Sequence, residues 1–141
     1  MKRTAKPPEN PAAQVLAIMQ AADERERLRT SAEGEPWTVE FCVTMAQATS
    51  LLRSDPRFMA VLIDRDVPRL EWEKAVRELA KTAPHATIML ASAHKQDGLW
   101  QRVVENGGHD LLLKPLRAGE VRRAVLHAHW YATTIHPGGA A

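Results

Sequence analysis

The stretch AVLIDRDVP, residues 60–68, runs four apolar residues directly into Asp64, Arg65 and Asp66 before Pro68. An apolar run without polar alternation is typical of a parallel strand that helices cover on both faces. We therefore expect a buried strand over residues 59–64 that ends on a carboxylate. Three uses of this carboxylate are open at this point: a loop-capping acid, a metal ligand or a nucleophile.

Length, composition and charge restrict the class of protein. The chain has 141 residues, of which 45% are hydrophobic and 26% charged, as in one globular domain. Its net charge of +2 comes from four charged residues near the N-terminus, so the remainder is formally neutral: Lys2, Arg3, Lys6 and Glu9. This argues against a nucleic-acid surface, which needs clustered basic residues. With a single cysteine and no long apolar stretch, we expect a cytoplasmic protein without disulfides or a membrane span.

Short apolar runs alternate with helix-period segments, which predicts five β-α units in one domain over residues 13–132. Residues 1–12 are expected to form a disordered leader. Residues 133–141, rich in Gly, Pro and Ala, are expected to form a flexible tail. The strands are expected at 14–19, 37–45, 59–64, 86–91 and 110–113, and the helices at 23–33, 46–55, 71–81, 98–106 and 118–132.

Polar residues at fixed offsets predict where the helices begin and end. Asp23 with Glu26, and Thr44 with Gln47, have the spacing of a capping box. In a capping box the first side chain bonds a helix N–H and the second reaches back toward the cap. Gly107–Gly108 is typical of a helix stop.

Five such units predict a doubly wound parallel sheet between two helix layers, an α/β fold in three layers. Ligands of these sheets bind beyond the carboxyl ends of the strands. The residues there are expected to be Met19, Gln20, Asp64 to Asp66, Ala91, Ser92 and Lys114. A lysine that ends a buried strand is costly without an anionic partner, and Asp64 is the obvious one. We therefore expect an acid, a hydroxyl and a lysine to converge at one edge of the sheet.

These residues and their spacing resemble the receiver domain of bacterial response regulators. The resemblance covers about residues 13–132 and rests on three motifs, LIDRDVP, LASAH and NGGHDLLLKPL. A proline stands four residues after Asp64, and a glycine stands seven residues before Lys114. The resemblance implies a flavodoxin-like sheet with strand order 2-1-3-4-5. The spacings in RDVPRLEW, LW and GGHDLLLKP are more similar to a subgroup of short, atypical receivers.

The resemblance also implies the roles of three residues. In the family, the aspartate that ends the third strand accepts a phosphoryl group from a histidine kinase, and a hydroxyl and a lysine contact the phosphoryl oxygens. By position these residues are Asp64, Ser92 and Lys114. Ser92 is chosen over Ala91 because it lies 22 residues before Lys114, which fits the family's spacing. The implied function is two-component signalling without enzymatic activity.

Two positions depart from the family pattern. Ordinary receivers end the first strand with a pair of acids that bind Mg²⁺, whereas this chain has Met19 and Gln20. The remaining expected ligands are Asp64, the backbone carbonyl of Asp66 and the amide carbonyl of Gln20. Because Asp64 and Lys114 alone are formally neutral, we expect weak Mg²⁺ affinity and slow phosphorylation.

The second departure is Leu111, which stands where the family commonly has a switching aromatic residue. Another element is therefore expected to replace it, and the helix that carries Trp100 is the first candidate.

For the histidines, the cysteine and the tryptophans, a functional role is compared with an ordinary structural one. His127 and His129 are two apart on a helix and point in different directions, which argues against chelation. His94 is expected to be a solvated loop residue and Cys42 a small buried apolar one. Four tryptophans against two phenylalanines are unusual, and one of the later two is a candidate for a partner surface.

Three functions are compared. The leading one is a stand-alone receiver that a histidine kinase or another signalling protein addresses, with a homodimer expected at the last two helices. The second is a pseudo-receiver that acts as an interaction or dimerisation adaptor without phosphate. The third, a flavin- or nucleotide-binding enzyme, is disfavoured because the loop MQAADER has no glycine to cradle a phosphate.

Overall fold

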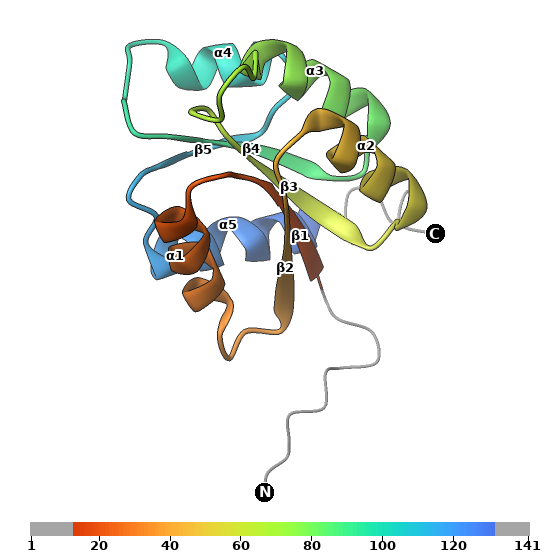
Figure 1. Ribbon diagram of the computed structural model, residues 1–141, viewed down its shortest axis with the longest axis vertical. Helices are drawn as coiled ribbons and strands as arrows, with labels where there is room; N and C mark the ends of the chain where they lie inside the picture. Colours follow the sequence, from red (N-terminus) through yellow and green to blue (C-terminus); the bar gives the residue numbers. More distant parts are fainter. Residues whose placement is uncertain (1–12, 132–141) are drawn as a thin grey trace, which may run out of the picture.

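The computed structural model describes residues 13–131, which form a five-stranded parallel sheet in the order β2-β1-β3-β4-β5 (Figure 1). This confirms the predicted doubly wound sheet and its strand order. The predicted leader over 1–12 and tail over 133–141 lie outside the described residues. The strands are β1 (Ala13–Ile18), β2 (Trp37–Cys42), β3 (Phe58–Asp64), β4 (Thr87–Ser92) and β5 (Asp110–Leu113), and the helices are α1 (Ala22–Ala32), α2 (Met45–Ser54), α3 (Trp72–Thr82), α4 (Leu99–Glu105) and α5 (Ala118–Trp130).

Helices cover both faces of the sheet (Figure 1). Helices α2, α3 and α4 pack on one face, and α1 and α5 pack on the other. Along β1 the side chains alternate between the two cores: Leu16 belongs to the first and Ala17 to the second. Because both faces are covered, side chains that point to either face are buried, which explains the absence of polar alternation in the central strands.

Helix ends follow the predicted signals at two positions. At α2 the Gln47 N–H donates to Thr44 Oγ1 over 3.1 Å, and Gln47 Oε1 accepts from the Val43 N–H over 3.1 Å, so the capping pair is confirmed. After α4, Gly107 has a φ of 99° and the Gly108 N–H donates to the Val103 carbonyl over 2.8 Å. The predicted glycine stop is therefore confirmed.

The predicted capping role of Asp23 is wrong. Helix α1 begins at Ala22, and the cap position is Ala21, which has no side-chain acceptor. Asp23 lies inside the first turn of the helix. There its negative charge interacts favourably with the positive end of the helix dipole, but its side chain does not cap the helix. The helix therefore begins one residue before the expected segment 23–33, and its cap lies two residues before Asp23.

Candidate functional site

Parallel register brings the ends of three neighbouring strands to one level. Asp64 of β3 pairs with Ala91 of β4, and Ser92 pairs with Leu113, the last residue of β5. Lys114 follows directly, its N–H donating to the Ser92 carbonyl over 2.9 Å. The Lys114–Pro115 peptide bond is cis. The edge of the sheet thus presents Asp64, Ser92 and Lys114 from consecutive strands, as the sequence predicts.

A short ion pair joins Asp64 and Lys114. The Lys114 Nζ lies 2.6 Å from Asp64 Oδ1, and both side chains are nearly inaccessible to solvent, at 6% and 3% exposed. Asp64 Oδ1 also accepts the backbone N–H of Asp66 over 2.9 Å, which holds the carboxylate at the start of the loop. The charged partner and the backbone donor together orient this buried carboxylate.

Two more carboxylates approach the same ammonium. Lys114 Nζ lies 2.9 Å from Asp66 Oδ2 and 3.1 Å from an oxygen of Glu24, which belongs to the first turn of α1. Asp66 therefore contributes its side chain, whereas the sequence predicted only its backbone carbonyl. The sequence reasoning also counted Asp64 and Lys114 as a neutral pair. With Glu24 and Asp66 ionised, three carboxylates and one ammonium give the group a formal charge of −2.

Charge and burial shift the pKa values of this group. Burial alone would lower the pKa of Lys114, but hydrogen bonds to Asp64, Asp66 and Glu24 raise it above its usual value. The pKa of Glu24 is raised, mainly by burial and then by the negative charge of Asp64, although Lys114 opposes this. Lys114 therefore stays charged across the physiological range.

Ser92 is fully buried, and its hydroxyl bonds to the loop that follows β4. Its Oγ donates to the His94 carbonyl over 2.8 Å and accepts the His94 N–H over 3.1 Å. The guanidinium of Arg65 lies beside it, with Nη1 3.5 Å from Ser92 Oγ and Nη2 3.0 Å from Gln96 Oε1. For the hydroxyl to donate to a ligand at Asp64, it has to leave the His94 carbonyl.

Sequence reasoning missed Glu24 and Arg65. Glu24 stands next to Asp23, for which the capping-box spacing predicts a helix cap. Its role depends on the phase of α1 relative to the end of β1, and the start of α1 was placed one residue late. Arg65 follows Asp64 directly, and its path across β4 to Gln96 depends on the conformation of the loop after β4.

Met19 and Gln20 stand where the family has its magnesium-binding acids, and their side chains differ in burial. The side chain of Met19 is fully buried in the core beneath α1 and α5, and Gln20 is exposed. Over residues 13–131, no group of three or more His, Cys, Asp or Glu side chains has an arrangement that could hold a metal ion. The ammonium of Lys114 lies where the carboxylates converge. The family's magnesium position therefore does not fit the residues at the end of β1.

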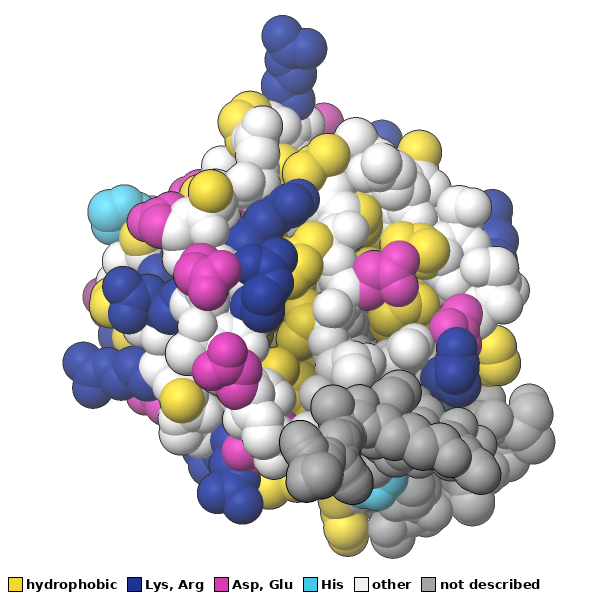
Figure 2. Space-filling view, turned by 60° about the horizontal axis from the view of Figure 1, so that its bottom comes forward, with side chains coloured by type: hydrophobic (Ala, Val, Ile, Leu, Met, Phe, Trp, Pro, Cys, Tyr) yellow, Lys and Arg dark blue, Asp and Glu magenta, His cyan; other side chains and the backbone are white. Residues whose placement is uncertain are grey.

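Cys42 matches its predicted structural role, and one face of the molecule shows how surface charges are distributed. Cys42 is buried, and burial raises the pKa of its thiol to about 11, so the thiol stays protonated at neutral pH. On the face seen in Figure 2, Lys and Arg side chains are interspersed with Asp and Glu and do not gather into one basic surface. Across residues 13–131, no helix has both the length and the apolar character needed to cross a membrane.

Solved structures of receiver domains share this fold. The signal receiver domain of an HD domain-containing protein from Pseudomonas fluorescens Pf-5 matches with a TM-score of 0.79 and 18% identity, over 96% of this chain and 97% of that one. A response regulator from Thermotoga maritima matches with 0.75 and 19%, over 83% and 97%. The chemotaxis response regulator CheY4 of Vibrio cholerae matches with 0.71 and 16%, over 82% and 98%.

Sequence comparisons add no closer relationship. The chain matches no protein-family model and no curated protein. The chain therefore has the receiver-domain fold of response regulators, at identities that establish the fold alone.

Proposed function

We propose that this protein is a receiver module of two-component signalling that accepts a phosphoryl group on Asp64. The observation that carries the proposal is the buried pair at the carboxyl edge of the sheet, with Lys114 Nζ 2.6 Å from Asp64 Oδ1. A buried carboxylate oriented beside a fixed cation is suited to attack an electrophilic phosphorus. Receiver domains generally interact with histidine kinases, and a histidine kinase or another signalling protein is the proposed donor.

The proposed transfer uses the side chains already at this edge. An oxygen of Asp64 forms a bond to phosphorus while the bond from phosphorus to the leaving group breaks, and the leaving group keeps the electron pair. Lys114 stabilises the negative charge on the phosphoryl oxygens. Ser92 exchanges its hydrogen bond with the His94 carbonyl for one to a phosphoryl oxygen, which makes its hydroxyl report on phosphorylation.

Mg²⁺ has a minor part in the proposal. The expected oxygen donors are Asp64, the Asp66 backbone carbonyl and Gln20, and the Asp66 and Glu24 carboxylates at the same edge are paired with Lys114. Because the ammonium already neutralises part of this charge, we expect the affinity for Mg²⁺ to be weak. Met19 offers a buried thioether, which is a poor ligand for a hard cation. Phosphorylation is accordingly expected to be slow.

A phosphate-independent adaptor is the second candidate function. It is favoured by Met19 in the core and by Leu111, which is partly buried against the core at the position expected for a switching aromatic residue. In this role the Asp64–Lys114 pair would be a fixed structural contact. Neither candidate is enzymatic, and for both we propose a cytoplasmic location and a homodimer through the last two helices.

The deciding experiment incubates the full chain with Mg²⁺ and phosphoramidate and measures the intact mass. One phosphate adduct on the wild type and none on Asp64→Asn supports the receiver mechanism. No adduct, together with no spectral response to beryllofluoride, would contradict it and favour the adaptor. The Asp110→Asn variant is the matched control, because Asp110 is a carboxylate at the opposite end of β5.

A further inference from the structure

Three carboxylates already surround the Lys114 ammonium in the resting protein. Nζ donates hydrogen bonds to Asp64 over 2.6 Å and to Glu24 over 3.1 Å, and it forms an ion pair with Asp66 at 2.9 Å. An ammonium has three N–H groups and no further donor. A phosphoryl group on Asp64 therefore competes with these carboxylates for the N–H groups of Lys114.

Glu24 is the partner that comes from a different element than the phosphoacceptor loop. Asp64 is the phosphoacceptor itself, and Asp66 lies two residues away in the same loop, its N–H bonded to Asp64 Oδ1. Glu24 instead belongs to α1 and makes the longest of the three contacts, with a side chain 26% exposed to solvent against 49% for Asp66. Its carboxylate is also one of the charges that a phosphoryl dianion on Asp64 would repel.

The surroundings of Glu24 offer a place for the released side chain. A pocket of about 200 Å³ adjoins the Glu24–Lys114 pair and is lined also by Arg27. Arg27 lies three residues after Glu24 on α1, the spacing at which oppositely charged side chains pair on a helix. Released from Lys114, Glu24 has a cation within reach on its own helix.

We infer that Glu24 occupies the place of a phosphoryl oxygen at Lys114, so that its carboxylate competes with phosphorylation of Asp64. This inference rests on the proposed function. Glu24 acts as a positioning residue through Lys114, and the reaction must displace it. Removing its charge weakens its contact with Lys114 and removes one repulsive charge from the site.

The test compares Glu24→Gln with wild type in phosphoramidate at one fixed Mg²⁺ concentration. An Asp64 oxygen bonds to phosphorus, the P–N bond breaks, and ammonia leaves with the electron pair. We expect the adduct to form about two- to fivefold faster in Glu24→Gln, the range of a partly exposed ion pair. Glu26→Gln, the same substitution on an exposed residue of α1 that pairs with Arg29, should match the wild type. An equal or slower rate in Glu24→Gln would overturn the inference.

A second measurement separates this inference from the proposed function. Titration with inorganic phosphate, followed by the NMR shifts of the Ser92 and Lys114 amides, reports anion binding at Lys114 without phosphoryl transfer. Binding tighter in Glu24→Gln by a similar factor supports the competition. If no variant forms an adduct, the phosphoacceptor function fails and this titration decides the inference alone. Equal phosphate affinity in wild type and Glu24→Gln would then overturn it.

Discussion

Lys114 is the residue on which the charge balance of the site depends. Asp64 is 2% exposed, and its carboxylate has the Lys114 ammonium as its charged partner. A buried ion pair adds little net stability, because both charges lose their hydration. Removing one partner is different, since it leaves the other charge buried and uncompensated. The loss of stability should therefore depend on which member of the pair is replaced by a neutral residue.

We predict that Lys114→Met lowers the free energy of unfolding by about 3–5 kcal/mol, because it leaves Asp64 without a cation. Asp64→Asn removes the buried anion and leaves Lys114 with Glu24 and Asp66, so its cost should be smaller. The double variant should recover much of the loss in Lys114→Met. Urea denaturation of the four proteins gives the coupling energy, and additive effects would contradict this account.

The stability contributed by Lys114 should also depend on pH. Its pKa is raised in the folded protein above the usual 10.5, through its hydrogen bonds to three carboxylates and against burial. The contribution is therefore complete below about pH 10.5 and is lost as the pH rises toward the folded-state pKa. We predict that the stability difference between wild type and Lys114→Met narrows above pH 10.5. Urea denaturation at pH 8 and at several values above 10.5 checks this, and a constant difference would argue against it.

At the level of secondary-structure elements, the loop between α4 and β5 depends on close backbone packing at Gly108. A Cβ added there would lie 2.6 Å from Val103 Cγ1 and 3.1 Å from the Val103 carbonyl oxygen. Val103 is itself fully buried in the core beneath α3 and α4, so it has little room to move. The second glycine of the predicted stop is therefore required by space rather than by its backbone angles.

We predict that Gly108→Ala lowers stability by about 1–3 kcal/mol, the usual cost of overpacking. Gly119→Ala is the matched control: Gly119 lies in α5, and a Cβ there meets nothing within 4 Å. It should be neutral or stabilise by up to about 1 kcal/mol, because alanine favours a helix over glycine. Thermal unfolding of both variants measures the contrast. Equal melting temperatures for the two would contradict the packing argument.

The elements also show which parts of the structure the sequence could predict. β5 was predicted at its observed bounds, and the other strands were displaced at one or both ends, because apolar runs and glycine or proline breaks are local signals. β2 was expected to reach residue 45 and ends at Cys42, since the chain must turn before Thr44 caps α2. Asp64, Ser92 and Lys114 were placed at one edge because parallel strands end together. Glu24 was missed because its position depends on the phase of a helix with no capping side chain.

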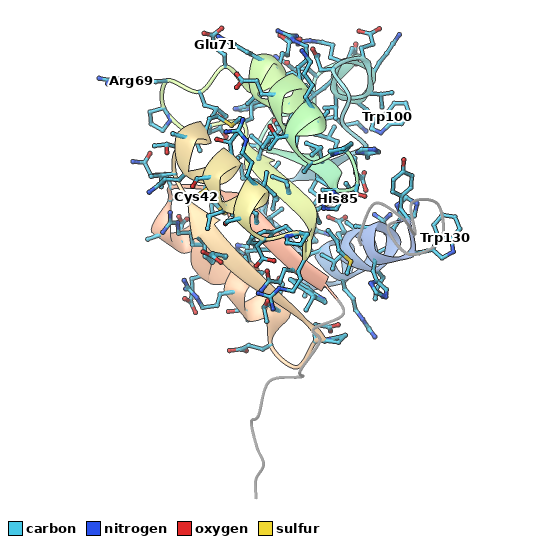
Figure 3. All side chains as sticks on the ribbon, turned by 90° about the vertical axis from the view of Figure 1, so that its right-hand side faces the viewer. Cys42, Arg69, Glu71, His85, Trp100 and Trp130 are labelled. Carbon is cyan, nitrogen blue, oxygen red and sulfur yellow. The ribbon has the colours of Figure 1, made fainter. Side chains whose placement is uncertain are left out.

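At the level of the whole molecule, large apolar side chains are exposed on α4, β5 and α5. Trp100 is 56% exposed and Trp130 51%, and both project to the same side of the view in Figure 3. Val104 of α4, Leu113 of β5 and Leu126 of α5 are exposed as well. Of the four tryptophans, Trp37 and Trp72 lie in the cores, whereas Trp100 and Trp130 are exposed. Exposed aromatic residues are typical of the centres of protein interfaces.

We predict that the full chain dimerises through this surface and that Trp100→Glu weakens the dimer at least tenfold, because it places a charge among apolar contacts. Sedimentation velocity over a range of protein concentrations measures the dissociation constant. Thr38→Glu is the control, since it adds the same charge to an exposed residue of β2, the opposite edge strand. A monomer at all concentrations, or equal weakening by both variants, would contradict the dimer interface. Repeating the measurement with Asp64→Asn tests whether dimerisation depends on the Asp64–Lys114 pair.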